Sequence, residues 1–370
     1  MKHIKIDLIV GARPNFIKIA PILKSLGRLT EVSCRLIHTG QHFDPMMSDD
    51  FFAKLGIASP DVNLGVGQSS HGQDQQTASI IAEYANYLDR DGAPDYLLVV
   101  GDVTSTMACS IVAAKRGIKI GHIEAGLRSF DRAMPEEINR IVCDSLTQLF
   151  FVSDPAGLAN LAAEGQPSAD IYNVGNIMID SLKAAKDHID QSTVLADNGL
   201  ASGKYVLLTL HRPSNVDDRK AITEILEAVE EVSKSMQVVF PIHPRTSKRL
   251  EGFGLKLPAN TVLMGPVSYF DSLRLIRDAY AVLTDSGGIQ EESSVFAVPC
   301  LTLRWNTERP VTTTLGSCEL VGNDKAKILK AWSDLRAGNW RPIEQIPLWD
   351  GKTADRIAEI IQQRWVRGEN

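Results

Sequence analysis

The chain has 370 residues, of which 44% are hydrophobic and 23% are charged, and its formal net charge is −6. This length predicts about two domains, and the composition is typical of a globular enzyme. The negative charge disfavours a broadly basic nucleic-acid surface. The first apolar run, Ile4–Val10, is too short for a signal peptide, and no run is long enough to cross a bilayer. We therefore expect a cytoplasmic protein with small-molecule partners, and neither nucleic acid nor a membrane among them.

The cysteines and the common cofactor motifs point away from metal and redox chemistry. The five cysteines are odd in number and widely spaced, so they predict neither a disulfide framework nor a CxxC site. The chain has no HExxH, no GxxxxGK[ST], no GxSxG, and no GxGxxG after its first apolar run. We expect no bound metal and no cofactor.

Short apolar runs alternate with amphipathic helical patterns along the whole chain. Such alternation predicts βα units and parallel sheets. The expected strands are Ile4–Val10, Ser33–His38, Tyr96–Val100, Lys119–Ile123, Leu149–Val152, a run ending near Asn173, Tyr205–Leu210, Gln237–Pro241, Thr261–Met264, Ala281–Thr284 and Pro299–Leu303. Helices are expected over Ile17–Leu26, Met178–Ala185, Ala221–Val232 and Thr353–Trp365, and residues 214–217 are expected to cap the third of them.

The predicted fold class is α/β, with two Rossmann-like, doubly wound parallel-sheet domains. The boundary is expected after residue 175, ahead of the polar segment 190–204, so the domains span residues 1–175 and 176–351. Ligands of open parallel sheets bind beyond the carboxyl ends of the strands. We therefore expect the two domains to face a shared cleft lined by the loops that follow their strands.

Residues 284–292, Thr-Asp-Ser-Gly-Gly-Ile-Gln-Glu-Glu, form the most informative segment. A buried strand that breaks at Ser286-Gly287-Gly288 and continues as a helix leaves backbone N–H groups at a positive helix end, which suits a phosphate. Glu291 and Glu292 would repel an anion, so they indicate a neutral polar group, such as a sugar hydroxyl, beside the phosphate. The segment therefore predicts a sugar-nucleotide site.

Polar residues follow other expected strands as well. Arg13 lies in a Gly-Ala-Arg-Pro turn, which favours a phosphate-facing position over a solvated one. His211 and His243 end corresponding strands, each with an arginine nearby, which favours a functional pair over two core histidines. Asp102 could cap the helix after it, but Glu124 holds the equivalent place on the next strand. Paired carboxylates of this kind can serve as base and acid.

Glu136 has a different setting. It follows Pro135 and precedes Glu137, and this pattern by itself indicates an ordinary helix start whose acids are favoured by the helix dipole. Without further information we interpret Glu136 as structural.

Ten ordered segments resemble the non-hydrolysing UDP-N-acetylglucosamine 2-epimerases, and the likeness covers nearly the whole chain. They are GARPNFIKIAPI (11–22), TGQH (39–42), GDVTST (101–106), GHIEAGLRS (121–129), MPEEINR (134–140), VGNIMID (174–180), TLHRPSNVD (209–217), TDSGGIQEE (284–292), TERPVT (307–312) and WDGKTADRI (349–357). The resemblance implies the GT-B architecture, with the last helix, residues 352–370, returning to the first domain. It also implies interconversion of UDP-GlcNAc and UDP-ManNAc by elimination of UDP to a 2-acetamidoglucal and re-addition.

The resemblance also implies roles for individual residues. The implied catalytic residues are Asp102, Glu124, Glu136 and His211, which reverses the structural interpretation of Glu136. The implied UDP-sugar contacts are Arg13, Lys18, His243, Ser286, Gly287, Gly288, Glu292 and Arg309, with Glu292 directed at the ribose. Gln41 and His42 fall in the region where some bacterial members bind a second UDP-GlcNAc as an activator. No cofactor is implied, and family members are commonly homodimers.

The chain departs from the family pattern in two places. It has Gly-Ala-Arg-Pro-Asn where many members have Gly-Thr-Arg-Pro-Glu, and Arg-Pro-Ser-Asn after His211 where Arg-Arg-Glu-Asn is common. The acyl sugar therefore stays open, and a UDP-linked diacetamido uronic acid is an alternative substrate. A GT-B glycosyltransferase and a non-catalytic sugar-nucleotide sensor are alternative functions, although Asp102 and Glu124 favour catalysis over sensing.

Overall fold

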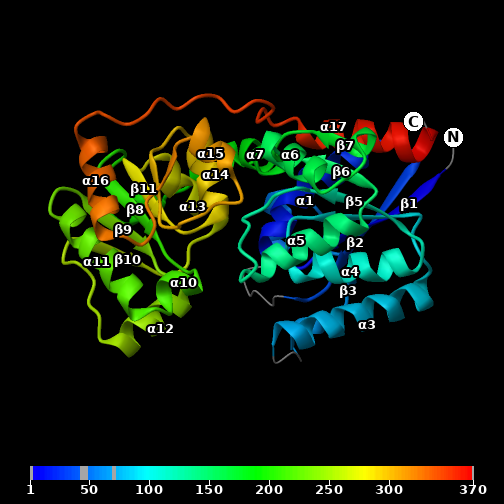
Figure 1. The fold of residues 1–370 in the computed structure, drawn as a ribbon, viewed down its shortest axis with the longest axis horizontal. Coiled ribbons are helices and arrows are strands. Elements are labelled where there is room, and N and C mark those ends of the chain that lie inside the picture. Colours follow the sequence, from blue (N-terminus) through cyan, green and yellow to red (C-terminus); the bar gives the residue numbers. More distant parts are fainter. Residues whose placement is uncertain (1–2, 42–48, 69–71, 369–370) are drawn as a thin grey trace. The chain divides into compact units, whose positions relative to one another are not determined.

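The computed structural model describes residues 3–41, 49–68 and 72–368, and it divides into two compact units. Unit 1 comprises Met1–Lys183 and Pro347–Asn370, and unit 2 comprises Ala184–Ile346. Each unit is an α/β domain built on its own parallel sheet (Figure 1). Among the described residues, no helix combines the length and the apolar character needed to cross a membrane.

A seven-stranded parallel sheet forms the centre of unit 1, in the order β3-β2-β1-β4-β5-β6-β7. Its strands are β1 (Ile4–Val10), β2 (Val32–His38), β3 (Val62–Asn63), β4 (Tyr96–Val100), β5 (Lys119–Ile123), β6 (Leu149–Val152) and β7 (Ile171–Asn173). The chain builds outward from β1 to β3 and then returns to pair β4 with the other side of β1. The carboxyl ends of β1 and β4 therefore flank the topological switch point, where open sheets bind ligands.

Helices cover both faces of this sheet. On one face α3 (Gln73–Asp91), α4 (Thr104–Lys115) and α5 (Pro135–Leu146) lie side by side and enclose a core that includes Leu97 and Val99 of β4 (Figure 1). Leu98, between them, lies on the opposite face near Trp365. The other helices of unit 1 are α1 (Arg13–Leu26), α2 (Asp49–Leu55), α6 (Pro155–Ala163), α7 (Ile177–Ala184) and α17 (Thr353–Ile361), with a π-helical turn over Gln362–Arg367 and 3₁₀ turns at Val66–Gln68 and Ser168–Asp170.

The last helix packs on unit 1 although it follows unit 2 in the sequence. Trp365 stacks on the ring of Tyr96 with the ring centroids 4.1 Å apart and the planes 8° from parallel. Gly121 of β5 makes room for it, since an ideal Cβ there would lie 2.9 Å from the Trp365 ring. Asp180 of α7 caps α17 by accepting its first two backbone N–H groups at 3.2 and 2.8 Å. The return of the last helix to the first domain thus has a packing cause.

The division between the units differs by a few residues from the expected boundaries at 175 and 352. It falls after Lys183 because α7 is buried within unit 1, where Ser181 Oγ donates to the Ile17 carbonyl at 2.6 Å. The chain returns at residue 347 because Trp349 is buried there and its indole N–H donates to the Ser153 carbonyl at 3.2 Å. Neither packing contact could be inferred from the local sequence pattern.

Unit 2 has a six-stranded parallel sheet in the order β10-β9-β8-β11-β12-β13. Its strands are β8 (Tyr205–Thr209), β9 (Gln237–Pro241), β10 (Thr261–Met264), β11 (Ala281–Thr284), β12 (Cys300–Thr302) and β13 (Cys318–Leu320). Its helices are α8 (Lys186–Gln191), α9 (Val194–Asp197), α10 (Pro213–Val216), α11 (Arg219–Ser233), α12 (Pro244–Phe253), α13 (Tyr269–Arg277), α14 (Gly287–Val295), α15 (Pro310–Thr314) and α16 (Lys325–Arg336). Because β8 and β11 are adjacent, their carboxyl ends form the switch point of this unit.

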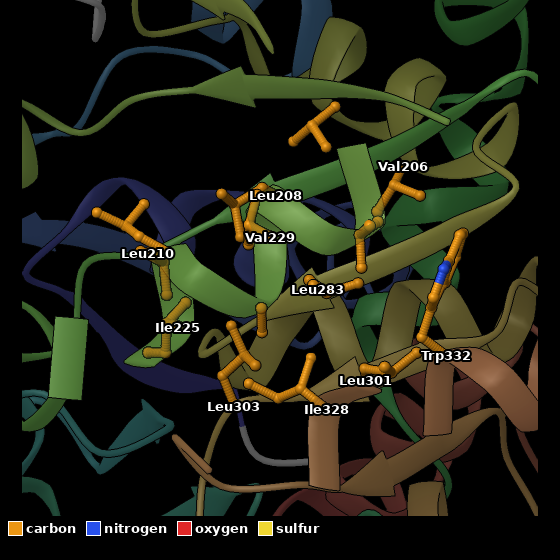
Figure 2. Close-up of a cluster of buried hydrophobic side chains, with 14 of the residues drawn as sticks. Val206, Leu208, Leu210, Ile225, Val229, Leu283, Leu301, Leu303, Ile328 and Trp332 are labelled. Atoms are coloured by element: carbon orange, nitrogen blue, oxygen red, sulfur yellow. The ribbon is translucent and has the colours of Figure 1, made fainter. Parts of the chain in front are cut away.

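Alternating residues of the unit 2 strands bury both faces of the sheet. Leu208 and Leu283 pack with Ile225 of α11 and Ile328 of α16 in the cluster that Figure 2 shows. The neighbouring strand residues, including Leu207, belong to a second cluster with α9 and α13. Strands buried on both faces read as continuous apolar runs, which is why they are recognisable in the sequence.

The expected secondary structure is largely confirmed. All the expected strands form, although the strand expected over 299–303 covers only Cys300–Thr302. β3 and β13 were not predicted, because Val62–Asn63 and Cys318–Leu320 are short and each contains a polar residue, so neither forms a continuous apolar run. The expected cap of α11 at residues 214–217 is wrong: these residues lie mostly in α10, and Asp218 caps α11 by accepting from the backbone of Lys220 and Ala221.

Candidate functional site

The carboxylates expected to be catalytic follow two neighbouring strands of unit 1. Asp102 follows β4 after Gly101, and Glu124 directly follows β5. Gly101 has a φ of +69°, and its N–H donates to the Ile123 carbonyl at 3.0 Å, so the chain turns tightly over the end of β5. An ideal Cβ on Gly101 would lie 3.5 Å from the Glu124 carboxylate. The turn therefore brings Asp102 and Glu124 to the same edge of the sheet.

Glu124 is buried and has a left-handed backbone, with a φ of +68°. This conformation is uncommon for residues other than glycine, and such strain is concentrated at functional sites. It is held by the backbone N–H groups of Glu124 and Ala125, which both donate to the Phe151 carbonyl at 3.0 and 3.1 Å. Lys18 of α1 places its ammonium 2.6 Å from Glu124 Oε2. Lys18 is thus bound to one of the candidate catalytic carboxylates.

Asp102 is held by α5. Its carboxylate accepts from Arg140 Nε at 3.0 Å, and its carbonyl accepts from the Asn139 side chain at 2.8 Å. The side chain of Asp102 keeps 29% of its surface exposed, so a ligand can reach it. Asp102 does not cap α4, because the residue at that N-cap is Val103. The capping alternative that the sequence left open is therefore wrong.

The two acids at the start of α5 have different surroundings. Glu137 is buried and accepts from the backbone N–H groups of Ser129 and Phe130 at 2.9 and 2.8 Å, and from Arg140. Glu136 is half-buried in the first turn of the helix. Glu137 is therefore the acid that the fold uses to hold the preceding loop, which leaves Glu136 as the candidate for chemistry.

The turn after β1 lies at the same edge of the sheet. Arg13 begins α1 directly after this turn, and Asn15 ties the turn to β4 by accepting from Ala12 N at 3.0 Å and donating to the Val100 carbonyl at 3.2 Å. Gln41, after β2, accepts from both the backbone N–H and the hydroxyl of Ser105 at 3.0 and 2.7 Å. His42 lies outside the described residues.

In unit 2, Asp285 is the centre of the switch-point loops. It is fully buried and accepts from the backbone N–H of His211 at 3.1 Å and of Arg212 at 2.9 Å, and from the Asn215 side chain at 3.2 Å. His211 Nδ1 lies 3.0 Å from its other oxygen. Burial raises the pKa of Asp285, but the contacts with His211 and Arg212 outweigh it and hold the pKa below its usual value. Asp285 is therefore an anion that orients His211.

The two histidines of the expected pair lie close together. Their ring centroids are 6.3 Å apart, and His211 remains 44% exposed. His243 is the N-cap residue of α12, and its Nδ1 accepts from Arg245 N at 3.2 Å. Burial, together with His211 and Arg245, lowers the pKa of His243. His243 is therefore a neutral imidazole at pH 7, with Nδ1 as the acceptor.

The Ser286-Gly287-Gly288 segment forms the expected break between β11 and α14. Ser286 is the N-cap residue of α14, and its backbone N–H donates to Thr284 Oγ1 at 3.0 Å. Gly287 is crowded, since an ideal Cβ would lie 2.6 Å from a Glu308 carboxylate oxygen and 3.0 Å from Arg309. At Gly288 a Cβ would meet open space. The positive end of α14 can therefore be approached from the side of Gly288.

A buried cluster of charges supports this helix start. Arg309 lies 2.6 Å from Glu291 and 2.5 Å from Glu308, so its charge is shared between two carboxylates. Burial raises the pKa of Glu308, but Arg309 and Arg304 outweigh it and hold the pKa far below its usual value. Burial and the nearby Glu291 raise the pKa of Glu292 to about 8. Glu292 is therefore uncharged at neutral pH, so it would not repel an anion as the sequence led us to expect.

Sequence reasoning missed three residues that organise these sites. Arg140 and Asn139 hold Asp102, and Asp285 holds His211. Asp285 could have been found, because it follows β11 at the switch point of the sheet. Nothing in the local sequence pattern indicated that α5 reaches back to the end of β4.

Comparisons with known proteins identify the family of the chain. The model of the UDP-N-acetylglucosamine 2-epimerase family matches residues 24–362. The UDP-N-acetylglucosamine 2-epimerase of Methanocaldococcus jannaschii is 38% identical to the chain over 369 residues, covering 96% of this chain and 98% of that protein.

The chain belongs to the UDP-N-acetylglucosamine 2-epimerase family. It is thus an isomerase, and its relatives support a UDP-sugar 2-epimerase function. One relative is the UDP-2,3-diacetamido-2,3-dideoxy-D-glucuronate 2-epimerase of Pseudomonas aeruginosa, 40% identical over 361 residues, covering 96% of this chain and 99% of that protein.

Solved structures of family members share the fold. The crystal structure of the Methanocaldococcus jannaschii enzyme in complex with UDP-GlcNAc and UDP has a TM-score of 0.88 at 37% identity, covering 97% of this chain and 99% of that one. The Neisseria meningitidis enzyme bound to UDP-GlcNAc has a TM-score of 0.87 at 29% identity, with coverages of 96% and 99%. A lipopolysaccharide galactosyltransferase at 12% identity has a TM-score of 0.53, which extends the likeness to the GT-B glycosyltransferase fold alone.

Proposed function

We propose that this protein interconverts UDP-GlcNAc and UDP-ManNAc. The observation that carries the proposal is the pair of strand-end carboxylates, Asp102 and Glu124, in a chain whose second unit presents an approachable helix N-terminus after β11. Carboxylates of this kind suit proton transfer at carbon, and a helix N-terminus suits the phosphate of a leaving nucleotide. Together they support elimination and re-addition.

In the proposed reaction, the carboxylates of unit 1 act at C2. The C2 proton is only weakly acidic, so its removal needs a positioned base. One of Asp102, Glu124 and Glu136 takes this proton while the C1–O bond to UDP breaks, which leaves 2-acetamidoglucal and UDP. A second carboxyl group then delivers a proton to the other face of C2, and UDP adds back at C1. Arg140 and Lys18 hold Asp102 and Glu124 in place for these steps.

The proposed role of unit 2 is to hold UDP. Departure of UDP leaves charge on the diphosphate, which N–H donors and cations stabilise. The proposed donors are the first backbone N–H groups of α14, at Gly287 and Gly288, together with the Ser286 hydroxyl, His211, His243 and Arg309 of the same unit. Arg13 of unit 1 stays a predicted UDP-sugar contact. Glu292 is uncharged below a pH of about 8, so we assign it to the ribose hydroxyls.

A second substrate is supported by a specific observation. The Pseudomonas aeruginosa diacetamido-glucuronate 2-epimerase is 40% identical to the chain, and the Methanocaldococcus jannaschii UDP-GlcNAc 2-epimerase is 38% identical. These two sequence identities are too similar to decide which of the two UDP-sugars is the substrate. Ala12 and Asn15, which replace threonine and glutamate of the common family motif, are the N-cap residue and the third residue of α1, on either side of Arg13.

The decisive experiment is to incubate the protein with UDP-GlcNAc in D₂O and to follow the sugar by NMR. Formation of UDP-ManNAc with deuterium at C2 supports elimination and re-addition, since the C2 proton must leave. The same experiment with the UDP-diacetamido uronate identifies the preferred sugar. If neither sugar exchanges its C2 proton, the proposed reaction is refuted.

Three further expectations stay predictions. They are a homodimer, a cytoplasmic location, and activation by a second UDP-GlcNAc near Gln41. Light scattering coupled to size-exclusion chromatography tests the dimer. Initial rates of UDP-ManNAc conversion, measured with and without a small amount of UDP-GlcNAc, test the activation.

A further inference from the structure

His122 is a buried, titratable residue that the proposed reaction does not use. It is the fourth residue of β5, two residues before Glu124, and it is fully buried. Its Nδ1 lies 2.7 Å from Asp144 Oδ1, and its Nε2 lies 2.8 Å from the Gly101 carbonyl oxygen. The histidine therefore connects α5 to the turn that carries Asp102.

Both partners of the ring are acceptors. A carbonyl oxygen cannot donate, so Nε2 must carry a hydrogen to make its contact with Gly101. Asp144 Oδ2 accepts from the Gly126 N–H at 3.0 Å and lies 2.7 Å from the Arg128 guanidinium, which keeps this carboxylate ionised. An ionised Asp144 also accepts from His122, so Nδ1 carries a hydrogen as well. With hydrogens on both nitrogens, the ring is an imidazolium.

The charges around the ring balance. Asp144 and Cys143 of α5 face His122. Arg128, in the loop after β5, donates two hydrogen bonds to the Glu164 carboxylate at 2.8 and 2.7 Å. Burial lowers the pKa of His122, but the Asp144 carboxylate outweighs it and holds the pKa well above its usual value. Burial raises the pKa of Asp144, but His122 and Arg128 outweigh it. Two cations and two carboxylates thus neutralise one another.

The same ion pair touches the backbone beside both candidate catalytic carboxylates. His122 holds the carbonyl of Gly101, the residue before Asp102. Asp144 holds the N–H of Gly126, two residues after Glu124. Glu124 has a strained backbone that must be held from both sides. A misplacement of a reacting group by about 1 Å can cost about 100-fold in rate.

We propose that His122 is a positioning residue, a permanently charged imidazolium that, with Asp144, fixes Asp102 and Glu124 relative to each other. It does not touch the substrate. Its charge is required because a neutral ring would turn a lone pair toward either Asp144 or the Gly101 carbonyl. The effect on turnover rests on the proposed 2-epimerase activity, whereas the protonation state does not.

The protonation state is tested by NMR of the full protein labelled with ¹⁵N-histidine. We expect one of the eight histidines to show both ring nitrogens protonated from pH 6 to pH 9, and this signal to vanish in His122→Gln. If that variant does not fold, Asp144→Asn provides the assignment, since removing the counter-ion should convert the same signal to a neutral ring. A neutral His122 at pH 7 in the wild type would overturn the proposal.

The positioning role is tested by kinetics. His122→Gln and Asp144→Asn should each lower kcat by about 100-fold and leave KM for the UDP-sugar nearly unchanged. His38→Gln is the matched control, because His38 is also a buried histidine of this sheet, at the end of β2. It should lower the melting temperature with little change in kcat. The positioning role would be contradicted if His38→Gln lowered kcat as much as the two variants, or if those variants changed KM and left kcat unchanged. An imidazolium signal in a protein that turns over no UDP-sugar would refute the proposed function and leave the charge of His122 established.

Discussion

Both units have acidic residues at the carboxyl ends of their strands, but the partners of these acids differ. In unit 1 Asp102 and Glu124 lie against Arg140 and Lys18. In unit 2 Asp285 is buried beneath the loop backbone and His211. The first arrangement pairs each carboxylate with a cation and leaves Asp102 partly exposed to a ligand. The second uses a carboxylate to orient neighbouring groups. Under the proposed function, we therefore expect the acids of unit 2 to support binding and those of unit 1 to transfer protons.

The protonation of acids differs between the units as well. Glu292 in unit 2 lies near Glu291, and its pKa is raised to about 8 by burial and by that neighbour. Asp144 in unit 1 is as deeply buried, but His122 and Arg128 keep its pKa below the usual value. Burial alone therefore does not decide the charge of an acid in this protein; the charged neighbour beside it does.

The largest expected effect comes from the carboxylates of unit 1. Asp102→Asn and Glu124→Gln should each lower kcat by about 10³-fold, because loss of a positioned acid or base typically costs this much. UDP affinity, measured by isothermal titration calorimetry, should stay unchanged. Normal turnover in a variant would show that its residue is not catalytic. Loss of UDP binding would contradict the proposal that UDP is held by unit 2 and not by these carboxylates.

Asp285→Ala should have the opposite effect, weakening UDP binding instead of acting on the proton-transfer step. It leaves the backbone N–H groups of His211 and Arg212 without their buried acceptor, at a cost of about 1–3 kcal/mol for each unsatisfied group, and the Asn215 amide keeps only its bond to the Leu303 carbonyl. We expect a lower melting temperature and weaker UDP binding. Asp217→Ala, which removes a half-buried carboxylate paired with Arg245 and Arg249, is the control and should change stability far less. Unchanged UDP affinity in Asp285→Ala would show that the switch-point loops of unit 2 do not depend on this acid.

Glu292 should make unit 2 sensitive to pH. Its pKa is raised in the folded state, so the protonated form stabilises the fold below the unfolded pKa, and this stability is lost as the pH rises toward about 8. The loss is at most about 1.4 kcal/mol per pH unit for one group. Glu292→Gln should flatten this dependence, as measured by urea denaturation between pH 5 and pH 9. Equal slopes for the wild type and the variant would contradict the buried neutral acid.

The smallest effects are expected at the two glycines of α14. Gly288→Ala should raise stability by up to about 1 kcal/mol, since its Cβ meets open space and alanine favours helix, yet it should weaken UDP binding if the diphosphate lies there. Gly287→Ala should lower stability, because its Cβ would meet Glu308 and Arg309. Calorimetric titration with UDP and thermal unfolding separate the two effects. Full UDP affinity in Gly288→Ala would place the diphosphate elsewhere.

Much of the fold was predictable because its physical causes are local. The strands of both sheets are apolar runs buried on two faces, and the glycine, proline and acidic residues that follow them mark the turns. For this reason Asp102, Glu124, His211 and the Ser286 segment could be placed at strand ends from residue order alone.

The remaining features depend on contacts between elements distant in the sequence. α17 returns to unit 1 because Trp365 stacks on Tyr96 over Gly121, and α5 reaches back to hold Asp102 through Arg140. The sequence by itself determined which residues lie at the strand ends, because continuous apolar runs mark the strands. Only the tertiary structure decided which groups hold these acids, since Lys18, Arg140 and His211 reach Glu124, Asp102 and Asp285 from other elements.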